Sequence, residues 1–141
     1  MNDAQGKTGK DGAPSVLEKI TAESRKRAEA LQGGFRPLEV NKVDFAAALR
    51  RTGKMPRLIA ELKRRSPSKG TLKEGLPAAQ AVELYAPYAA ALSILTEPAH
   101  FMGSIEDLKE ARRLTDLPLL RKDFIVDIKQ IDEARAAGAN S

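Results

Sequence analysis

The sequence contains no cysteine and no tryptophan among its 141 residues, and it has a single histidine, His100. Without cysteine the chain has no disulfide and offers no thiolate to a metal or a substrate, which fits a reducing compartment. One histidine cannot build a metal cluster, so we predict no metal site.

The longest uncharged run, residues 84–96, is shorter than the roughly 18 residues of a membrane span. The first residues also lack the apolar segment of a signal peptide. We therefore expect a cytoplasmic protein that does not contact a membrane.

Aromatic residues are also scarce, at 4% of the chain, whereas 42% of the residues are hydrophobic and 30% are charged. The interior must therefore be built mainly from leucine, isoleucine, valine and alanine, which suits helices packed on a sheet in one compact domain. The formal net charge of +5 favours an anionic partner. Nucleic acid, an acidic membrane surface and a phosphorylated metabolite all meet that condition, and charge alone does not choose among them.

The first third of the chain predicts a leader and a helical extension. Residues 1–13 are polar and without periodicity, which is typical of a disordered leader. Residues 14–56 follow as an N-terminal helical extension. Ser15 and Glu18 have the spacing of a capping box, and Leu17 begins an apolar stripe behind them. The helices predicted in this extension cover residues 15–32 and 44–51.

Strands and helices alternate strictly from residue 57 onward. The predicted strands are 58–63, 92–96 and 118–121, and the predicted helices are 77–85, 104–114 and 127–137. Short strands joined by crossover helices form right-handed βαβ units and a parallel sheet, so the fold class is α/β. The next element in this alternation would be a fourth strand, and the pattern is interrupted before it.

Two charged residues share one face of the first predicted strand. Alternate side chains of a strand point the same way, so Glu61 and Lys63 lie on the face of Ile59. One interpretation is a solvated edge with a weak ion pair. The other is a polar cluster at the carboxyl end of a buried parallel strand, where α/β proteins place their ligands. We favour the second, because apolar residues fill both faces of this strand and a buried charge is costly without a purpose.

A second cluster of charge ends the third predicted strand. Lys122 has the same parity as Leu120 and Phe124, and a lysine in such a position can donate a proton, form a Schiff base or bind an anion. A solvated surface lysine is the alternative. The basic loop 63–69 has no interleaved aromatic residues and no nucleic-acid-binding motif accompanies it, so it suits a small phosphate or carboxylate better than nucleic acid. His100 is interpreted as an incidental loop residue.

Three segments, LIAELKRRSPSKG, LSILTEPAHFMGS and LPLLRKDFIVDIKQIDEARAAGAN, resemble in order and spacing three successive blocks of the indole-3-glycerol phosphate synthase family. The resemblance covers about residues 15–141. It implies a (β/α)8 TIM barrel with an N-terminal helical extension. Residues 57–141 would then be the first three βα units of the barrel, truncated before strand 4.

The resemblance also implies a reaction and its residues. Members of this family convert 1-(2-carboxyphenylamino)-1-deoxyribulose 5-phosphate to indole-3-glycerol phosphate in tryptophan biosynthesis, with loss of carbon dioxide and water and without a cofactor. By this resemblance Lys122 is the general acid for ring closure, Lys63 holds the anionic substrate, and Glu61 orients the two lysines. The residues matching the anthranilate pocket are Ser66, Pro67, Phe101 and Phe124.

Three of eight strands do not close a barrel, so we expect the chain alone to be catalytically inactive or nearly so. Its open strand edges favour aggregation or pairing with a missing carboxyl-terminal half. Two other functions stay open. One is a barrel enzyme in which Lys122 forms a Schiff base, and the other is a non-catalytic module that binds anions or nucleic acid through residues 63–69.

Overall fold

The computed structural model describes residues 13–39, 43–73 and 75–141, and its centre is a parallel sheet of three strands. These strands are β1 (Ile59–Leu62), β4 (Ala91–Leu95) and β5 (Leu119–Lys122), and they lie in the order β1-β4-β5. All three were predicted from the sequence within two residues of their observed ends. The chain is therefore a mixed α/β protein with a small parallel sheet.

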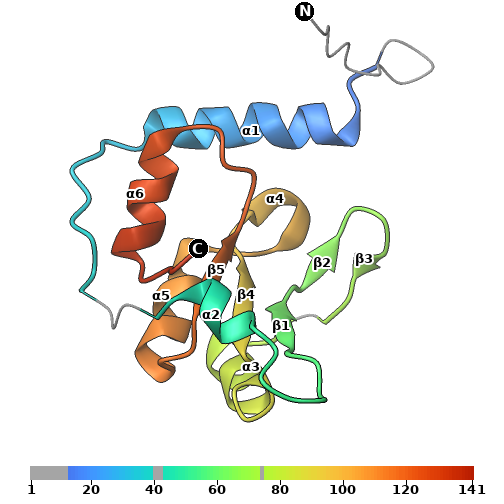
Figure 1. Ribbon diagram of the computed structural model, residues 1–141. Helices are drawn as coiled ribbons and strands as arrows, with labels where there is room; N and C mark the ends of the chain where they lie inside the picture. Colours follow the sequence, from blue (N-terminus) through green and yellow to red (C-terminus); the bar gives the residue numbers. More distant parts are fainter. Residues whose placement is uncertain (1–12, 40–42, 74) are drawn as a thin grey trace, which may run out of the picture.

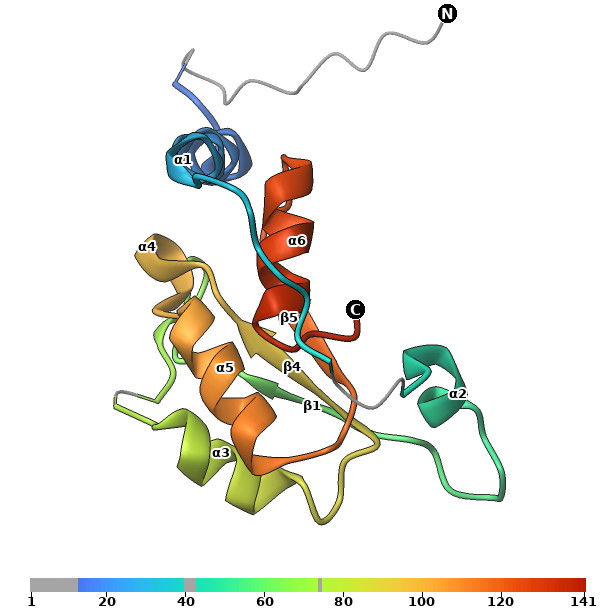
Figure 2. The ribbon, with the colours of Figure 1, turned by 90° about the vertical axis from the view of Figure 1, so that its left-hand side faces the viewer.

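Three helices follow the strands and pack against one face of the sheet. They are α3 (Ala78–Tyr85), α5 (Ile105–Leu114) and α6 (Ile128–Ala136), and Figure 2 shows α3 and α5 lying along the strands. The core between the helices and the sheet is aliphatic, as the composition predicted. Its buried residues are Leu62, Leu76, Ala78, Ala81, Val82, Leu92, Ile94, Leu108, Ala111, Leu119, Ala134, Ala137 and Ala139.

The helix α1 (Val16–Ala30) crosses the carboxyl ends of the strands (Figure 1). The predicted capping box is present, since the Ser15 hydroxyl accepts from the Glu18 amide and the Glu18 carboxylate accepts from the Ser15 amide. The predicted apolar stripe was wrong at one position, because Leu17 is 59% exposed. The buried face of the helix is formed instead by Ile20, Ser24 and Ala28, at successive intervals of four residues.

The second predicted helix is present as α2 (Phe45–Leu49), with Asp44 as its N-cap. The Asp44 carboxylate accepts hydrogen bonds from the backbone amides of Ala46 and Ala47. The helix ends two residues before its predicted end. Most of the leader predicted over residues 1–13 lies outside the described residues.

Two elements were not predicted. The basic loop contains a small hairpin of β2 (Arg65–Ser66) and β3 (Gly70–Thr71), and a single helical turn, α4 (Pro98–Phe101), follows β4. The buried carboxylate of Glu97 caps α4 by accepting from three successive backbone amides. Both elements lie at the carboxyl ends of the strands that precede them, where α/β proteins place functional groups.

The first strand is less buried than the sequence indicated. The apolar residues on its two faces predicted burial on both sides, but Ile59 is 39% exposed and Leu58 is 52% exposed. Ile59 is exposed because α3, α5 and α6 cover one face of the sheet and Ile59 points to the opposite face with Glu61, whereas Leu58 precedes the first residue of β1. Among the described residues, no helix combines the length and the apolar character that crossing a membrane requires.

Candidate active site

The strand register places the predicted charged residues on one face of the sheet. Glu61 of β1 lies beside Ser93 of β4, and Leu95 of β4 lies beside Lys122 of β5. Alternate residues of a strand share a face, so Ser93 and Leu95 point the same way and so do their neighbours. Glu61 and Lys122 therefore project from the same side of the sheet, which is the side that α3 and α5 leave open. The predicted parity of the first and third strands is confirmed.

Glu61 is the centre of a small polar cluster. Its Oε1 lies 2.6 Å from Nζ of Lys63, and its Oε2 accepts a hydrogen bond from the Ser93 hydroxyl at 3.2 Å. The side chains of Glu61 and Lys63 are 31% and 34% exposed. Because both carboxylate oxygens are engaged, Glu61 holds the Lys63 ammonium at the carboxyl end of β1.

Lys122 stands apart from this cluster. It is the last residue of β5 and is exposed. In the described part of the chain, neither a hydrogen bond nor an ion pair engages its ammonium group. Lys122 is thus available to a ligand on the open face, with the strand β4 between it and the Glu61 and Lys63 pair.

The two predicted aromatic residues of the site meet. Phe101 ends α4 and Phe124 follows β5, and their ring centroids lie 6.2 Å apart with a tilt of 36°. This separation is within the range of a favourable aromatic pair. Both rings are half-buried. A flat aromatic ligand therefore has an apolar surface available close to the strand that ends in Lys122.

Ser66 and Pro67 lie on the hairpin rather than in the sheet. Ser66 is in β2, and Pro67 begins the turn to β3, where the Ser66 hydroxyl accepts from the Lys69 amide at 3.2 Å. The strand β2 lies close to α4, which carries Phe101. Pro67 is exposed. The hairpin is thus placed beside the aromatic pair, but no hydrogen bond between described residues joins Ser66 to the other predicted site residues.

Arg64 fixes the start of this hairpin. Its guanidinium forms two hydrogen bonds of 2.7 Å with the carboxylate of Asp107 in α5, and it also donates to the carbonyls of Leu76 and Met102. The Arg64 and Asp107 side chains are only 13% and 12% exposed. Of the basic loop 63–69, Lys63 and Arg64 are therefore already paired with carboxylates, which weakens the interpretation of this loop as a nucleic-acid-binding surface.

The carboxyl group of Asp107 has a perturbed pKa. Burial opposes ionisation, but hydrogen bonds from Arg64 and Ser104 outweigh it and hold the pKa of Asp107 below its usual range. The same carboxylate raises the pKa of the Arg64 guanidinium, against the opposing effect of burial. This pair stays ionised at neutral pH and ties the loop after β1 to the first turn of α5.

A second ionic cluster lies between α1 and the strand ends. Arg27 of α1 binds Glu97 at 3.3 Å and Asp123 at 3.1 Å, and Asp123 also contacts Arg121 at 3.3 Å. The side chains of Glu97 and Asp123 are 0% and 1% exposed. Thr96 donates to Asp123 at 2.8 Å. Two buried carboxylates are stable here because each has several donors.

One group of side chains has the arrangement of a cation site, but its atoms are engaged. Glu23, Glu97 and His100 bring one ligand atom each within 4.8 Å of one another. The Glu97 carboxylate already accepts from Arg27 and from the backbone of α4, and Nε2 of His100 lies 2.9 Å from Glu23. His100 is thus part of a helical turn that contacts α1, and not the loop residue that was predicted.

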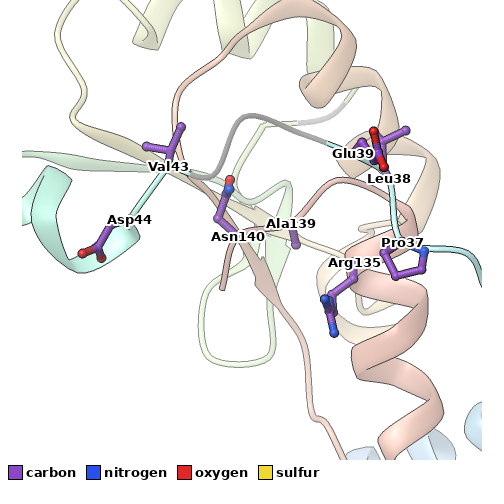
Figure 3. A pocket seen from close by; sticks show the side chains of 8 residues that line it. All are labelled: Pro37, Leu38, Glu39, Val43, Asp44, Arg135, Ala139 and Asn140. Atoms are coloured by element: carbon purple, nitrogen blue, oxygen red, sulfur yellow. The ribbon is translucent and has the colours of Figure 1, made fainter.

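One large cavity lies away from the predicted site residues. It has a volume of about 620 Å³ and lies at the chain segment before α2 and the end of α6. Figure 3 shows Pro37 and Arg135 on one side of it and Val43 and Asp44 on the other. Its lining includes none of the predicted site residues. The candidate site is therefore an open face of the sheet and not an enclosed pocket of this chain.

Several residues around the site were missed by the sequence analysis. They are Arg27, Arg64, Glu97, Asp107, Arg121 and Asp123. A usable signal was present for two of them, since Glu97 and Asp123 lie within two residues of the ends of predicted strands, where a buried charge needs a partner. The partner Arg27 has no local signal, because it is 70 residues from Glu97 in the sequence.

Comparison with known proteins gives a consistent result. The sequence model for indole-3-glycerol phosphate synthase matches residues 14–141. A protein of that name from Nautilia profundicola is 44% identical over 131 residues, which cover 89% of this chain and 51% of the relative. The one from Burkholderia multivorans is 44% identical over 137 residues, with 89% and 52% covered. The one from Variovorax paradoxus is 41% identical over 144 residues, with 91% and 54% covered. The chain thus spans about half the length of these relatives.

Proposed function

Because the chain belongs to the indole-3-glycerol phosphate synthase family, we propose that it forms the amino-terminal part of such an enzyme. In this proposal residues 14–56 are a helical extension, and residues 57–141 are the first three βα units of a (β/α)8 barrel. The open face of the sheet becomes the inside of the barrel. The observation that carries the proposal is the projection of Glu61 and Lys122 from that one face, at the carboxyl ends of two parallel strands that flank β4.

The proposed substrate is 1-(2-carboxyphenylamino)-1-deoxyribulose 5-phosphate, and the product is indole-3-glycerol phosphate. Lys122 donates a proton to the substrate carbonyl oxygen while the ring carbon that bears the carboxylate attacks the carbonyl carbon. Lys63 binds the carboxylate until carbon dioxide leaves, and the resulting hydroxyl then departs as water. The same oxygen atom needs a proton twice, first as the carbonyl and then as the departing hydroxyl, and both lysines are donors. The proton that the substrate loses in the dehydration goes to a general base, which this chain would receive from the rest of the barrel. No oxidant, reductant or cofactor enters this balance.

The remaining predicted residues have supporting roles in this proposal. Glu61 orients Lys63, to which it is bound at 2.6 Å, and accepts a hydrogen bond from the sugar part of the substrate. Phe101 and Phe124 hold the anthranilate ring, and Ser66 and Pro67 close over it from the hairpin. The substrate is a phosphorylated metabolite, so the partner is a small molecule and the proposed location is the cytoplasm.

We further propose that the chain needs the rest of the barrel for activity. Five more strands would supply the second edge pairing for β1 and β5, a general base, and the groups that bind the phosphate. A polypeptide equivalent to the carboxyl-terminal half of a relative would pair with the open strand edges. By itself the chain is expected to be inactive or nearly so.

The test joins this chain to the carboxyl-terminal half of the Nautilia profundicola relative and measures indole-3-glycerol phosphate formation. We expect Lys122→Met to lower kcat by roughly 100-fold to 10,000-fold, the usual contribution of a general acid. Lys63→Met should lower kcat/KM chiefly through binding. The matched control is Lys109→Met, on the helical layer, where the lysine pairs only with the exposed Glu106.

Near-normal activity of both lysine variants would contradict the proposed roles. Borohydride reduction in the presence of the substrate separates this mechanism from a Schiff base, since a covalent adduct at Lys122, detected by mass, would favour the latter. The expected result is no adduct.

A further inference from the structure

The helix α1 contacts the candidate site through a row of polar side chains. Ser24 and Arg27 lie three residues apart, so they face the same way, toward the carboxyl ends of β4 and β5. Ser24 is fully buried, and its hydroxyl donates to the carbonyl of Phe124 at 2.5 Å. A helix that only covered the barrel mouth would not need a buried hydroxyl bonded to the backbone of a site residue.

Arg27 bridges two buried carboxylates that belong to different strands. One of its nitrogens binds Glu97, two residues after the end of β4, and the other binds Asp123, directly after β5. Without Arg27, Glu97 keeps only backbone amides and Asp123 keeps Arg121 and Thr96 as donors. The backbone ladder between β4 and β5 fixes the strand ends themselves. Among the described residues, the guanidinium is the side chain that joins the two carboxylates beyond those ends.

Each of these carboxylates in turn holds an aromatic residue. Glu97 accepts from the Phe101 amide at 3.1 Å and thereby caps the helical turn that carries this ring. Asp123 accepts from the Phe124 amide at 2.8 Å. The separation of the two rings thus depends on the separation of two carboxylates, and Arg27 is the group bound to both.

We propose that Arg27 is a positioning residue, which holds Phe101 and Phe124 at the spacing needed to bind the anthranilate ring. This inference rests on the proposed function for the identity of the ring. The positioning of the two rings by Arg27 does not depend on which ligand they bind. In this proposal α1 is part of the site although it does not contact the substrate. The helix sets the positions of two rings that do contact it.

The test uses the 141-residue chain and compares Arg27→Ala with Lys26→Ala, an exposed neighbour of equal charge on the same helix. Amide exchange is followed by NMR at Phe101 and Phe124, and at Leu92 and Ile94 in the buried strand β4 as a measure of global stability. We expect Arg27→Ala to accelerate exchange at the two phenylalanine amides about tenfold and leave Leu92 and Ile94 within about twofold. The nuclear Overhauser effect between the two rings should weaken in the same variant.

Two further measurements complete the test. Arg27→Lys keeps the charge but has one nitrogen instead of two, so it should restore part of the protection, and it decides the question if the alanine variant does not fold. The probe N-(2-carboxyphenyl)glycine, which carries the anthranilate group, is titrated into each protein. Its Kd should rise about fivefold in Arg27→Ala and stay unchanged in Lys26→Ala.

Equal acceleration of all four amides in Arg27→Ala would mean that Arg27 only stabilises the fold, and it would overturn the inference. Unchanged exchange at Phe101 and Phe124 would overturn it as well. Failure of the unsubstituted chain to bind the probe would count against the proposed substrate, whereas the exchange data would still decide whether Arg27 positions the rings.

Discussion

Gly103 is the residue at which the backbone around the site leaves no room for a side chain. A Cβ atom there would lie 2.1 Å from the carbonyl oxygen of Leu95 and 2.9 Å from the amide nitrogen of Thr96. Both atoms belong to the backbone at the end of β4 and cannot rotate away. We expect Gly103→Ala to lower the free energy of unfolding by about 1–3 kcal/mol, the usual cost of overpacking. Urea unfolding followed by circular dichroism measures this change.

The control for this prediction is Gly53→Ala, since a Cβ at Gly53 meets no atom within 4 Å. Its free energy of unfolding should stay within about 0.5 kcal/mol of that of the unsubstituted chain. Equal midpoints for the two variants would show that the loop after α4 shifts freely, and the prediction for Gly103 would be wrong.

At the residue scale, the sequence predicted what depends on local spacing. Period two placed Glu61 and Lys63 together, and it gave Lys122 the parity of Leu120. The common face of Glu61 and Lys122 follows from the strand register, which the sequence alone does not contain. It did not predict Arg27 beside Asp123, because these residues are 96 positions apart and their contact depends on how α1 packs across the sheet. Long-range ion pairs leave no periodic signal in one sequence.

At the scale of elements, the ion pair between Arg64 and Asp107 joins β1 to α5 and predicts a pH dependence. The pKa of Asp107 is lower in the folded chain than the value of about 3.9 in the unfolded one. The stabilisation is therefore fully present above about pH 4 and is lost as the pH falls through the folded pKa. We expect Asp107→Asn to cost about 2 kcal/mol at pH 7, the contribution of charged hydrogen bonds, and clearly less at about pH 2.5.

The comparison for Asp107 is Glu106→Gln in the same helical turn. Glu106 pairs with Lys109, but its side chain is 68% exposed, so the substitution should change the unfolding free energy by less than about 0.5 kcal/mol at either pH. Unfolding is measured with denaturant at both pH values. A cost of Asp107→Asn that did not shrink in acid would contradict the prediction.

Three of the helices that the sequence predicted have an N-cap side chain and two or more turns. Ser15 begins α1, Ser104 begins α5, and Asp127 begins α6, each by accepting a backbone amide in the first turn. The hairpin of β2 and β3 and the single turn α4 were missed because a two-residue strand and a single helical turn are too short to show a hydrophobic pattern. Such short elements have no periodicity, and hydrogen bonds from distant groups decide whether they form.

At the scale of the whole molecule, helices cover one face of the sheet, whereas the other face is exposed at β1 and at the end of β5. Its central strand is buried there at Ala91, Ser93 and Leu95. The core packs between the sheet and α3, α5 and α6, whereas the open face carries Ile59 and the charged site residues. No strand pairs with the outer edge of β1 in the part of the chain that the structure describes. An open edge beside partly exposed apolar side chains favours association with another polypeptide.

This asymmetry predicts that the chain associates with itself through the open face. Ile59→Lys should reduce the association, because a lysine at this 39% exposed position repels its counterpart in a second copy. Leu114→Lys is the matched control, since Leu114 is 53% exposed at the end of α5 on the opposite layer. Sedimentation velocity over a range of concentrations measures both. Equal effects of the two variants would place the contact outside the sheet. A selective effect of Ile59→Lys would identify the open face as the surface through which two copies associate.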